Sequence, residues 1–286
     1  MHRRRALRRR RIAALVVLVA VAVVAVFAAQ RVTDLVGVDE HGAKVETIDI
    51  DSRAVGRSVP VTVIVPKALE DATRPPLLVF LHGRGGEAGS EASEAFYAAL
   101  ESLGSRAPVV AMPDGGDHMY WHDRREGNWG RLVTREVIPE VARRFGTDPR
   151  RVAIGGISMG GFGAFDIARL NRGRFCAVGG HSPALWTIAG ETAEGAFDDA
   201  EDFARHDVIR AAGSSPASWG RARLWIDGGG GDPFRPGIDA FTAAVRANGT
   251  SISAHKWPGG HEGSYWSEHW EDYARFYARA LARCRR

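Results

Sequence analysis

The sequence Gly-Ile-Ser-Met-Gly at residues 156–160 constrains the fold more than any other feature of this chain. It follows the apolar run 151–154 and precedes residues 161–165, which are predicted to continue as a helix. A strand, a sharp turn and a helix in this order present the hydroxyl of Ser158 at the positive end of the helix. The flanking glycines leave room for a strained backbone at the serine. The pattern predicts a nucleophilic serine, and the alternative is a loop that only caps a helix.

A nucleophilic serine needs a base that takes its proton and an acid that orients the base. On a fold with this kind of turn, the acid and then the histidine follow the serine along the chain. Asp232 lies in the loop after the predicted strand 222–227, and His261 lies in the loop after the last predicted strand, 251–257. Catalytic groups of open α/β sheets lie at the carboxyl ends of strands, which is where both residues fall.

The acid and the base each have alternatives that the sequence leaves open. Asp227 is a rival acid at the end of its strand, and Asp232 could instead be an N-cap followed by Pro233 at the first helical position. The chain has ten histidines. Of these, His269 falls two turns into the last predicted helix and is expected at the surface, whereas the glycine-rich loop around His261 favours that residue as the base.

An oxyanion hole needs two main-chain N–H groups that point at the developing negative charge. Met159, directly after the serine, supplies one in this type of turn. The apolar run 76–81 is typical of a central parallel strand and ends in the glycine-rich residues 82–86, so that Arg84 is the candidate for the second donor. The alternative is an ordinary turn between a strand and a helix. A phosphate-binding loop is excluded because no Gly-Lys-Ser/Thr follows.

Four segments together resemble one group of α/β-hydrolases, the putative esterase family: residues 81–83, 156–161, 231–234 and 260–266. This family includes the esterase D (S-formylglutathione hydrolase) group, feruloyl-type carbohydrate esterases and secreted mycolyltransferases. The resemblance extends from about residue 45 to the C-terminal helix. The resemblance implies that Ser158 is the nucleophile, Asp232 the acid and His261 the base. It also implies that the main-chain N–H groups of Arg84 and Met159 are the oxyanion donors.

The first residues of the chain are typical of a segment that directs a protein to a membrane. Residues 1–11 contain seven arginines and no acid, and residues 12–29 are uncharged and rich in valine and alanine. The positive-inside rule places the N-terminus in the cytoplasm. We therefore expect the catalytic part outside the membrane, in a bacterial cell envelope, either anchored by residues 12–29 or secreted after their removal as a signal peptide.

The remaining chain suits one α/β-hydrolase domain at residues 45–286, joined to the leader by a linker at 30–44. Residues 45–50 and 59–65 alternate like antiparallel strands. Strands and helices then alternate, which predicts a mostly parallel central sheet with helices on both faces. Residues 183–220 lie between two predicted strands, where a cap over the active site would be inserted. Trp121 and His122 could flank the pocket mouth, although packing is their ordinary role.

Charge and cysteine content exclude some partners. The chain has 38 basic and 34 acidic residues, and without the seven arginines of the leader 31 basic residues face the 34 acidic ones. The basic pI therefore belongs to the leader and gives no reason to propose a nucleic-acid partner. Cys176 is expected to be a buried apolar filler, and the sequence does not indicate whether it pairs with Cys284. The spacing of histidines, cysteines and acids reveals no metal-ligand cluster, and no cofactor motif is present.

These patterns predict an extracytoplasmic serine esterase that hydrolyses an ester or transfers its acyl group through an acyl-enzyme on Ser158. The substrate would be a small-molecule, carbohydrate or lipid ester. One alternative is an envelope acyltransferase of the mycolyltransferase type, and another is a non-catalytic binding protein on the same fold. An intact set of serine, acid and histidine argues against a pure binder. Residues 183–220 carry few large apolar side chains, so we expect a short acyl pocket.

Overall fold

The computed structural model describes residues 37–284. The leader expected at residues 1–29 and the first part of the linker, 30–36, lie outside the described residues. Within 37–284, no helix is both long enough and apolar enough to cross a membrane.

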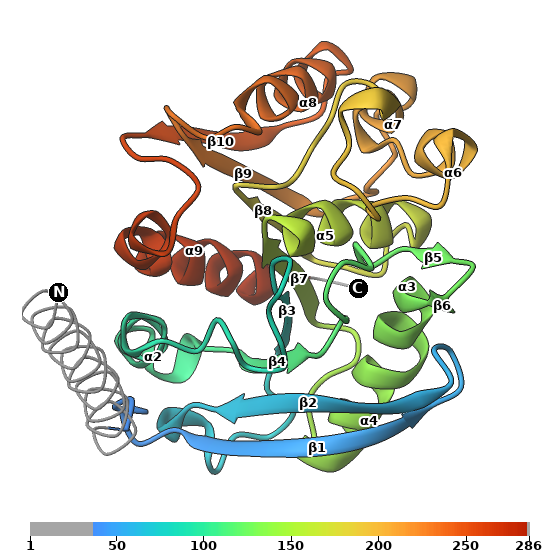
Figure 1. The fold of residues 1–286 in the computed structure, drawn as a ribbon. Helices are drawn as coiled ribbons and strands as arrows, with labels where there is room; N and C mark the ends of the chain where they lie inside the picture. The colour runs from blue at the N-terminus through green and yellow to red at the C-terminus, as the bar shows by residue number, and fades with distance from the viewer. Residues whose placement is uncertain (1–36, 285–286) are drawn as a thin grey trace, which may run out of the picture. The chain divides into compact units, whose positions relative to one another are not determined.

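The described chain is built around one large sheet with the strand order β1-β2-β4-β3-β7-β8-β9-β10 (Figure 1). β1 pairs with β2, and β2 with β4, in antiparallel fashion, and the other neighbours are parallel. This confirms the mostly parallel sheet and the antiparallel edge. The strands are β1 (Lys44–Ser52), β2 (Arg57–Val65), β3 (Leu77–Leu81), β4 (Val109–Pro113), β7 (Val152–Ile157), β8 (Ala177–His181), β9 (Arg223–Gly229) and β10 (Ile252–Trp257). A separate small ribbon pairs β5 (Asp123–Arg124) with β6 (Gly127–Asn128).

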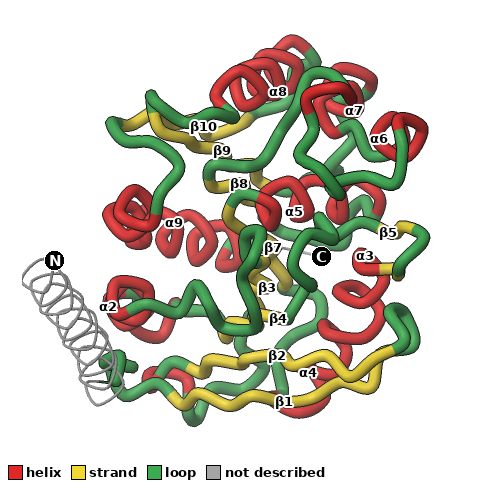
Figure 2. Tube along the Cα trace, viewed as in Figure 1, coloured by secondary structure: helices red, strands yellow, loops and turns green. Residues whose placement is uncertain are grey.

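Helices cover both faces of the sheet, as Figure 2 shows. One face carries α2 (Glu94–Ser102) and α9 (Gly263–Ala282). The other carries α3 (Trp129–Arg131), η3 (Leu132–Val137), α4 (Ile138–Phe145), α5 (Met159–Leu170), α7 (Val208–Ser214) and α8 (Arg235–Ala247). Shorter helices are η1 (Lys67–Leu69), η2 (Gly104–Arg106), η4 (Ala189–Glu191) and α6 (Ala200–Arg205).

The apolar run of β3 explains why the sheet is covered on both sides. Leu77, Val79 and Leu81 belong to the core under α5 and α8, whereas Leu78 and Phe80 belong to the core under α2 and α9. Alternate side chains of a strand point to opposite faces, so a continuous apolar strand needs helices on each face. The carboxyl end of β3 is thereby fixed in the centre of the molecule, beside that of β7.

The helix predicted before the serine strand is present but not uniform. α3 and α4 are joined by η3, a six-residue π-helical segment. Leu132, Val133, Val137, Ile138 and Val141 of this stretch are buried in the core on one face of the sheet. Along α9, Trp270, Tyr273, Tyr277 and Leu281 are buried in the core on the other face, and Tyr265 is buried as well.

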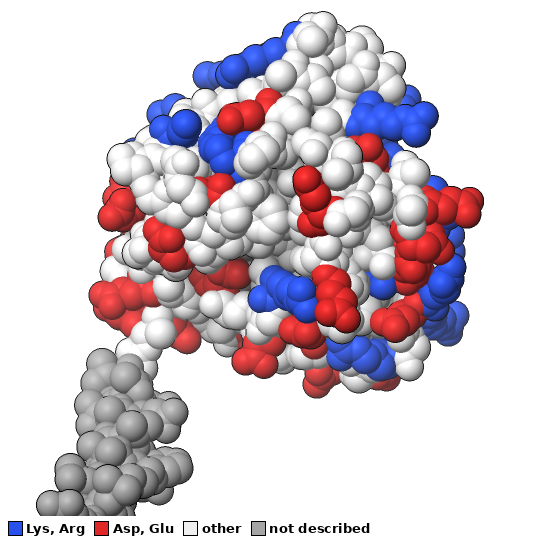
Figure 3. Space-filling view, turned by 45° about the horizontal axis from the view of Figure 1, so that its top comes forward, with Lys and Arg blue, Asp and Glu red and all other residues white. Residues whose placement is uncertain are grey.

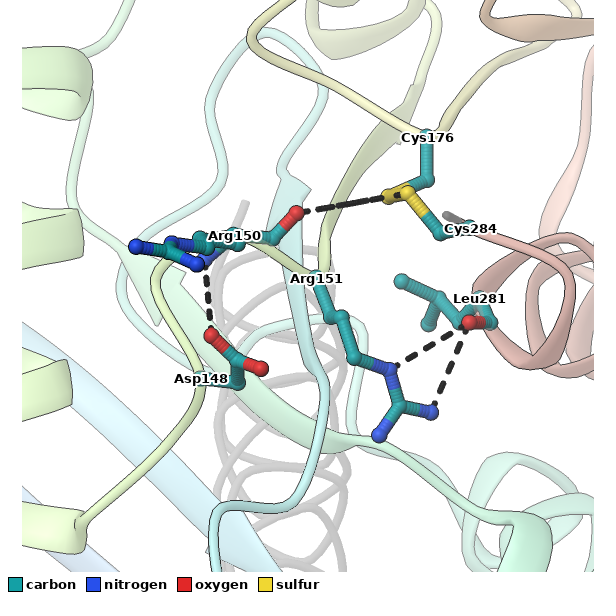
Figure 4. Close-up of a disulfide and its surroundings, with 6 residues drawn as sticks. All are labelled: Asp148, Arg150, Arg151, Cys176, Leu281 and Cys284. Carbon is teal, nitrogen blue, oxygen red and sulfur yellow. Dashed lines mark hydrogen bonds between the residues drawn. A yellow bond between two sulfur atoms is a disulfide. The ribbon is translucent and has the colours of Figure 1, made fainter. Parts of the chain in front are cut away.

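Cys176 and Cys284 form a disulfide whose Cα atoms are 5.6 Å apart and whose residues are 108 positions apart in the sequence (Figure 4). Cys176 is buried in the core as expected, but it does more than fill space, because it is bonded to Cys284. The last turn of α9 returns to the beginning of β8, where Arg151 also donates hydrogen bonds to the carbonyl oxygen of Leu281. Only the tertiary fold brings the two cysteines together, which is why their spacing gave no indication of the bond.

Charged side chains are mixed on the molecular face shown in Figure 3. Basic and acidic residues are interspersed around a largely uncharged centre.

Candidate active site

Ser158 occupies the sharp turn between β7 and α5. Its backbone has φ 53° and ψ −113°, a conformation outside the regions that L-residues prefer. Three backbone hydrogen bonds hold this strained residue: its N–H donates to the carbonyl oxygen of His181 at 3.0 Å, and its carbonyl oxygen accepts from the N–H groups of Ala184 at 3.0 Å and Phe162 at 3.1 Å. A Cβ atom at Gly160 would lie 2.0 Å from the carbonyl oxygen of Leu81, so only glycine fits there. The predicted strand, turn and helix are thus present.

Ser158, His261 and Asp232 form one chain of hydrogen bonds. His261 Nε2 lies 2.9 Å from Ser158 Oγ, and His261 Nδ1 lies 3.1 Å from Asp232 Oδ2. The other carboxylate oxygen of Asp232 accepts a hydrogen bond from the Phe234 N–H at 2.8 Å. The Asp232 side chain is fully buried, whereas the imidazole of His261 is 21% exposed. The arrangement gives the serine a base, and gives the base a buried carboxylate that can stabilise its protonated form.

The rival acid, Asp227, is engaged elsewhere. Its carboxylate accepts hydrogen bonds from His181, Trp225, Tyr265 and Tyr273 at distances of 2.7–3.0 Å. Burial, reinforced by the charge of Asp227, raises the pKa of Tyr265, so this phenol remains a donor. Of the two acids that the sequence left open, the structure therefore brings Asp232 to His261.

The loops that carry the acid and the base are bonded to each other. Gly230 donates a hydrogen bond to the carbonyl oxygen of Trp257, and Gly231 donates one to that of Gly259, both at 2.9 Å. A Cβ atom at Gly229 would lie 2.4 Å from the carbonyl oxygen of Gly259. The glycine run before Asp232 thus allows two loops to pack backbone against backbone, which fixes the separation of the acid and the histidine.

The two candidate oxyanion donors belong to two segments that come close to the serine, the start of α5 and the loop after β3. Met159 is the first residue of α5, so its N–H has no acceptor within the helix. The Arg84 loop passes close to the serine, since a Cβ atom at Gly83 would lie 3.6 Å from that of Ser158. The neighbouring N–H groups donate to Glu91 Oε1 and to the carbonyl oxygen of Asp117, whereas the Arg84 N–H has no acceptor among the described residues. Both N–H groups are therefore available to a ligand.

His82 fixes the loop of Arg84 from behind. Its Nδ1 lies 2.7 Å from the Gly83 carbonyl oxygen, and its Nε2 accepts from the Gly115 N–H at 2.8 Å. Burial lowers the pKa of His82, and a neutral imidazole with its proton on Nδ1 satisfies both contacts. This histidine therefore ties the Arg84 loop to the segment after β4.

Aromatic side chains that the sequence analysis did not single out surround the histidine. The rings of Phe234 and Trp266 meet His261 edge-on, with centroids 5.0 and 5.2 Å away. Trp186 packs on Phe234 at 5.5 Å and on Tyr120 at 5.5 Å. We call Tyr120, Trp186, Phe197 and Phe234 the aromatic wall; Phe197 packs against the first two. One sequence signal could have indicated an aromatic residue at this site: Phe234 follows the acid, Asp232, by only two residues.

The structure decides other expectations about individual residues. Of the two roles open to Trp121 and His122, packing is the one found: both are buried, and the Trp121 indole donates to the His82 carbonyl oxygen at 3.2 Å. His269 is not a surface residue, because its ring stacks on Trp257 at 3.9 Å and is half-buried. The spacing along the sequence revealed no cluster of metal-ligand type, whereas the fold brings His122, Asp202 and His206 together.

Comparisons with known proteins agree with this geometry. A family model described as "Putative esterase" matches residues 52–283. Esterase Rv1288 of Mycobacterium tuberculosis is 24% identical over 251 residues, which cover 73% of this chain and 53% of that protein. The chain thus spans about half the length of this curated relative.

Solved structures show the same fold. A ferulic acid esterase superposes with a TM-score of 0.74 at 21% identity, covering 83% of this chain and 98% of the other. An S-formylglutathione hydrolase from Agrobacterium tumefaciens superposes with a TM-score of 0.71 at 22% identity, covering 84% and 96%.

Proposed function

Because the chain belongs to the Putative esterase family, we propose that it is a serine esterase that acts through an acyl-enzyme on Ser158. The observation that carries the proposal is the hydrogen-bonded chain from Ser158 through His261 to Asp232 at a strained turn. A serine that only caps a helix would have no need of a histidine 2.9 Å from its hydroxyl.

The reaction follows from the positions of these groups. Ser158 Oγ attacks the carbonyl carbon of the ester, and His261 takes the hydroxyl proton. The N–H groups of Arg84 and Met159 stabilise the negative charge on the former carbonyl oxygen. The alcohol then leaves with the proton from His261, and the acyl group stays on Ser158. A second nucleophile gives its proton to His261, attacks the acyl carbon and releases Ser158.

The second nucleophile decides between two activities. Water gives a carboxylic acid and makes the protein a hydrolase, whereas a sugar hydroxyl gives a new ester and makes it an acyltransferase of the mycolyltransferase type. The imidazole of His261 is 21% exposed, which lets water reach the base, so we propose hydrolysis as the main reaction. The substrate is a small-molecule or carbohydrate ester, and a lipid ester is the alternative.

The compartment is a further part of the proposal. The arginine-rich leader with its apolar stretch places the enzymatic domain outside the cytoplasmic membrane, anchored or secreted, in a bacterial cell envelope. The disulfide between Cys176 and Cys284 supports an oxidising compartment.

The experiment that tests the activity is hydrolysis of p-nitrophenyl acetate by the purified protein, combined with mass spectrometry of the acylated chain. We expect Ser158→Ala to abolish turnover and the acyl mass increment while leaving the Tm nearly unchanged. Ser251→Ala, at an exposed serine, is the matched control and should behave like the wild type. Turnover close to that of the wild type in Ser158→Ala would refute the mechanism. A folded wild type that binds esters without turnover would favour a non-catalytic binding protein.

A further inference from the structure

A second cluster of ionisable side chains lies away from the triad and has no part in the proposed reaction. His122 precedes β5, Asp202 belongs to α6, and His206 follows that helix. The side chains of His122 and Asp202 are fully buried, and that of His206 is 9% exposed. His122 Nε2 lies 3.0 Å from Asp202 Oδ2, and His206 Nε2 lies 3.7 Å from Asp202 Oδ1. The three side chains converge from segments some 80 residues apart.

The three side chains of this cluster are close enough to share one metal ion. Tetrahedral zinc, with bonds of about 2.0–2.2 Å to nitrogen and oxygen, holds its ligand atoms roughly 3.3–3.5 Å from one another. The separations of 3.0 Å from His122 Nε2 to Asp202 Oδ2 and of 3.7 Å from His206 Nε2 to Asp202 Oδ1 lie on either side of that range, but they end on different oxygens of the carboxylate. One ligand atom from each residue can be chosen so that all three lie within 4.8 Å of one another. Binding of an ion would therefore draw the side chains closer together.

The proton on His206 is held on the side away from the cluster. Its Nδ1 lies 2.8 Å from Asp166 Oδ2, so Nδ1–H donates to that carboxylate and Nε2 presents a lone pair to Asp202. A cation beside the carboxylate makes such an arrangement favourable, and in the structure Arg205 Nη2 lies 3.0 Å from the same oxygen, Asp202 Oδ1. Ligating histidines commonly have this carboxylate partner on the second nitrogen, because it fixes the tautomer and the orientation of the ring.

The cluster also has an unpartnered polar atom. His122 Nδ1 is buried and has no hydrogen-bond partner among the described residues. A cavity of about 220 Å³ is bordered by His122 and by Asp166, which contacts His206. This cavity therefore reaches one edge of the cluster, although Asp202 and His206 do not line it.

We propose that His122, Asp202 and His206 bind one divalent transition-metal ion, with zinc as the best match to two imidazoles and a carboxylate. Asp166 positions His206, and the fourth coordination position is left to a water molecule. Arg169 and Arg205 neutralise the two carboxylates in the structure, and Arg205, whose side chain is half-exposed, can turn to solvent when the ion binds.

The role of this ion would be structural. Phe197 stacks on His122 with centroids 5.1 Å apart and on Tyr120 at 6.3 Å. The metal would thus join α6 to the segment before β5 and hold the aromatic wall in place. We expect its removal to affect stability and KM more than kcat, since no ligand touches Ser158, His261 or Asp232.

The test is metal content and thermal stability of the purified full chain, produced without a polyhistidine tag and stripped with a chelator. We expect stripped protein to take up about one equivalent of zinc sulfate, measured by elemental analysis after dialysis. At a free zinc concentration 100-fold above the Kd, the Tm should rise by roughly 5–10 °C. Both effects should vanish in Asp202→Asn and His206→Gln. His118→Gln, which alters an exposed histidine beside Asp117, should retain them.

Uptake below a tenth of an equivalent, with no change of Tm on addition of zinc, would overturn the proposal. The same zinc response in His118→Gln and in both cluster variants would show binding elsewhere and would also overturn it.

Discussion

His181 Nδ1 lies 2.8 Å from Asp227 Oδ1, so a fully buried imidazole–carboxylate pair lies in the sheet near the pair formed by His261 and Asp232. His181 Nε2 contacts the hydroxyl of Tyr277 at 2.9 Å, and its ring stacks on Tyr273 at 3.6 Å. The buried pair therefore attaches α9 to β8 and β9. α9 begins at Gly263, two residues after His261, so this attachment also fixes the position at which the loop of His261 ends.

The two acids give a first prediction, because they serve different purposes. Asp232→Asn should lower kcat by roughly 10⁴ with little change in Tm, since the imidazole would be held in the wrong tautomer. Asp227→Asn should cost far less in kcat, but should destabilise the fold by at least about 2 kcal/mol, because buried donors lose a charged acceptor. Steady-state kinetics and urea unfolding of both variants measure the two effects. The reverse ranking in kcat would assign the acid to Asp227.

A second prediction concerns the disulfide. Loss of a bond that closes a loop of this size should destabilise the protein by about 2–4 kcal/mol, which corresponds to a decrease in Tm of roughly 4–16 °C. The comparison is between the wild type with and without dithiothreitol. Cys176→Ser/Cys284→Ser should have the low Tm under both conditions. Activity at room temperature should persist, since neither cysteine lies near Ser158. Equal Tm values for oxidised and reduced wild type would contradict the prediction.

A third prediction concerns the leader. A chain that begins at Gln30 should be soluble and as active as the full chain, because the strands and helices that position the triad begin with β1 at Lys44. Size-exclusion chromatography and esterase assays of the two chains, the longer one in detergent, provide the comparison. Aggregation or inactivity of the shorter chain would mean that residues before Gln30 contribute to the hydrolase core.

A fourth prediction concerns the acyl chain. The members of the aromatic wall pack on one another beside His261, and we expect this wall to limit the length of the acyl group that the site accepts. Each methylene without an apolar neighbour loses roughly 0.8 kcal/mol of burial, so kcat/KM should decrease from C2 towards C16 p-nitrophenyl esters. Trp186→Ala should shift the optimum to longer chains, and Trp257→Ala, outside the wall, should not. A steady rise towards C16 in the wild type would instead indicate a lipid donor.

The sequence alone was sufficient for features that depend on local order along the chain. The turn at Ser158 and the strand-end positions of Asp232 and His261 follow from motifs of a few residues and from the rule that parallel strands end at one edge of the sheet. The family match confirms the resemblance and the classification as an esterase-family enzyme. The catalytic roles of these residues stay predictions.

Features that depend on distant contacts could not be predicted in this way. The partners of Asp227 come from β8, β9 and α9, and those of His122 come from a helix some 80 residues later. The disulfide joins residues 108 positions apart. In each case the residues next to the side chain in the sequence carry no signal of its partner. The partner is determined only when whole helices and strands pack together. The choice between Asp227 and Asp232 was open for the same reason.

The backbone hydrogen bonds between the loops of Asp232 and His261 divide the active site into two parts with different tolerance of substitution. On one side, main-chain hydrogen bonds hold the loops of the acid and the base. A substitution that moves this backbone would also move the reacting atoms, so we expect it to be poorly tolerated. On the other side, Tyr120, Trp186 and Phe197 are held mainly by ring packing. New substrate preferences can therefore arise on the aromatic side while the chemical machinery stays unchanged.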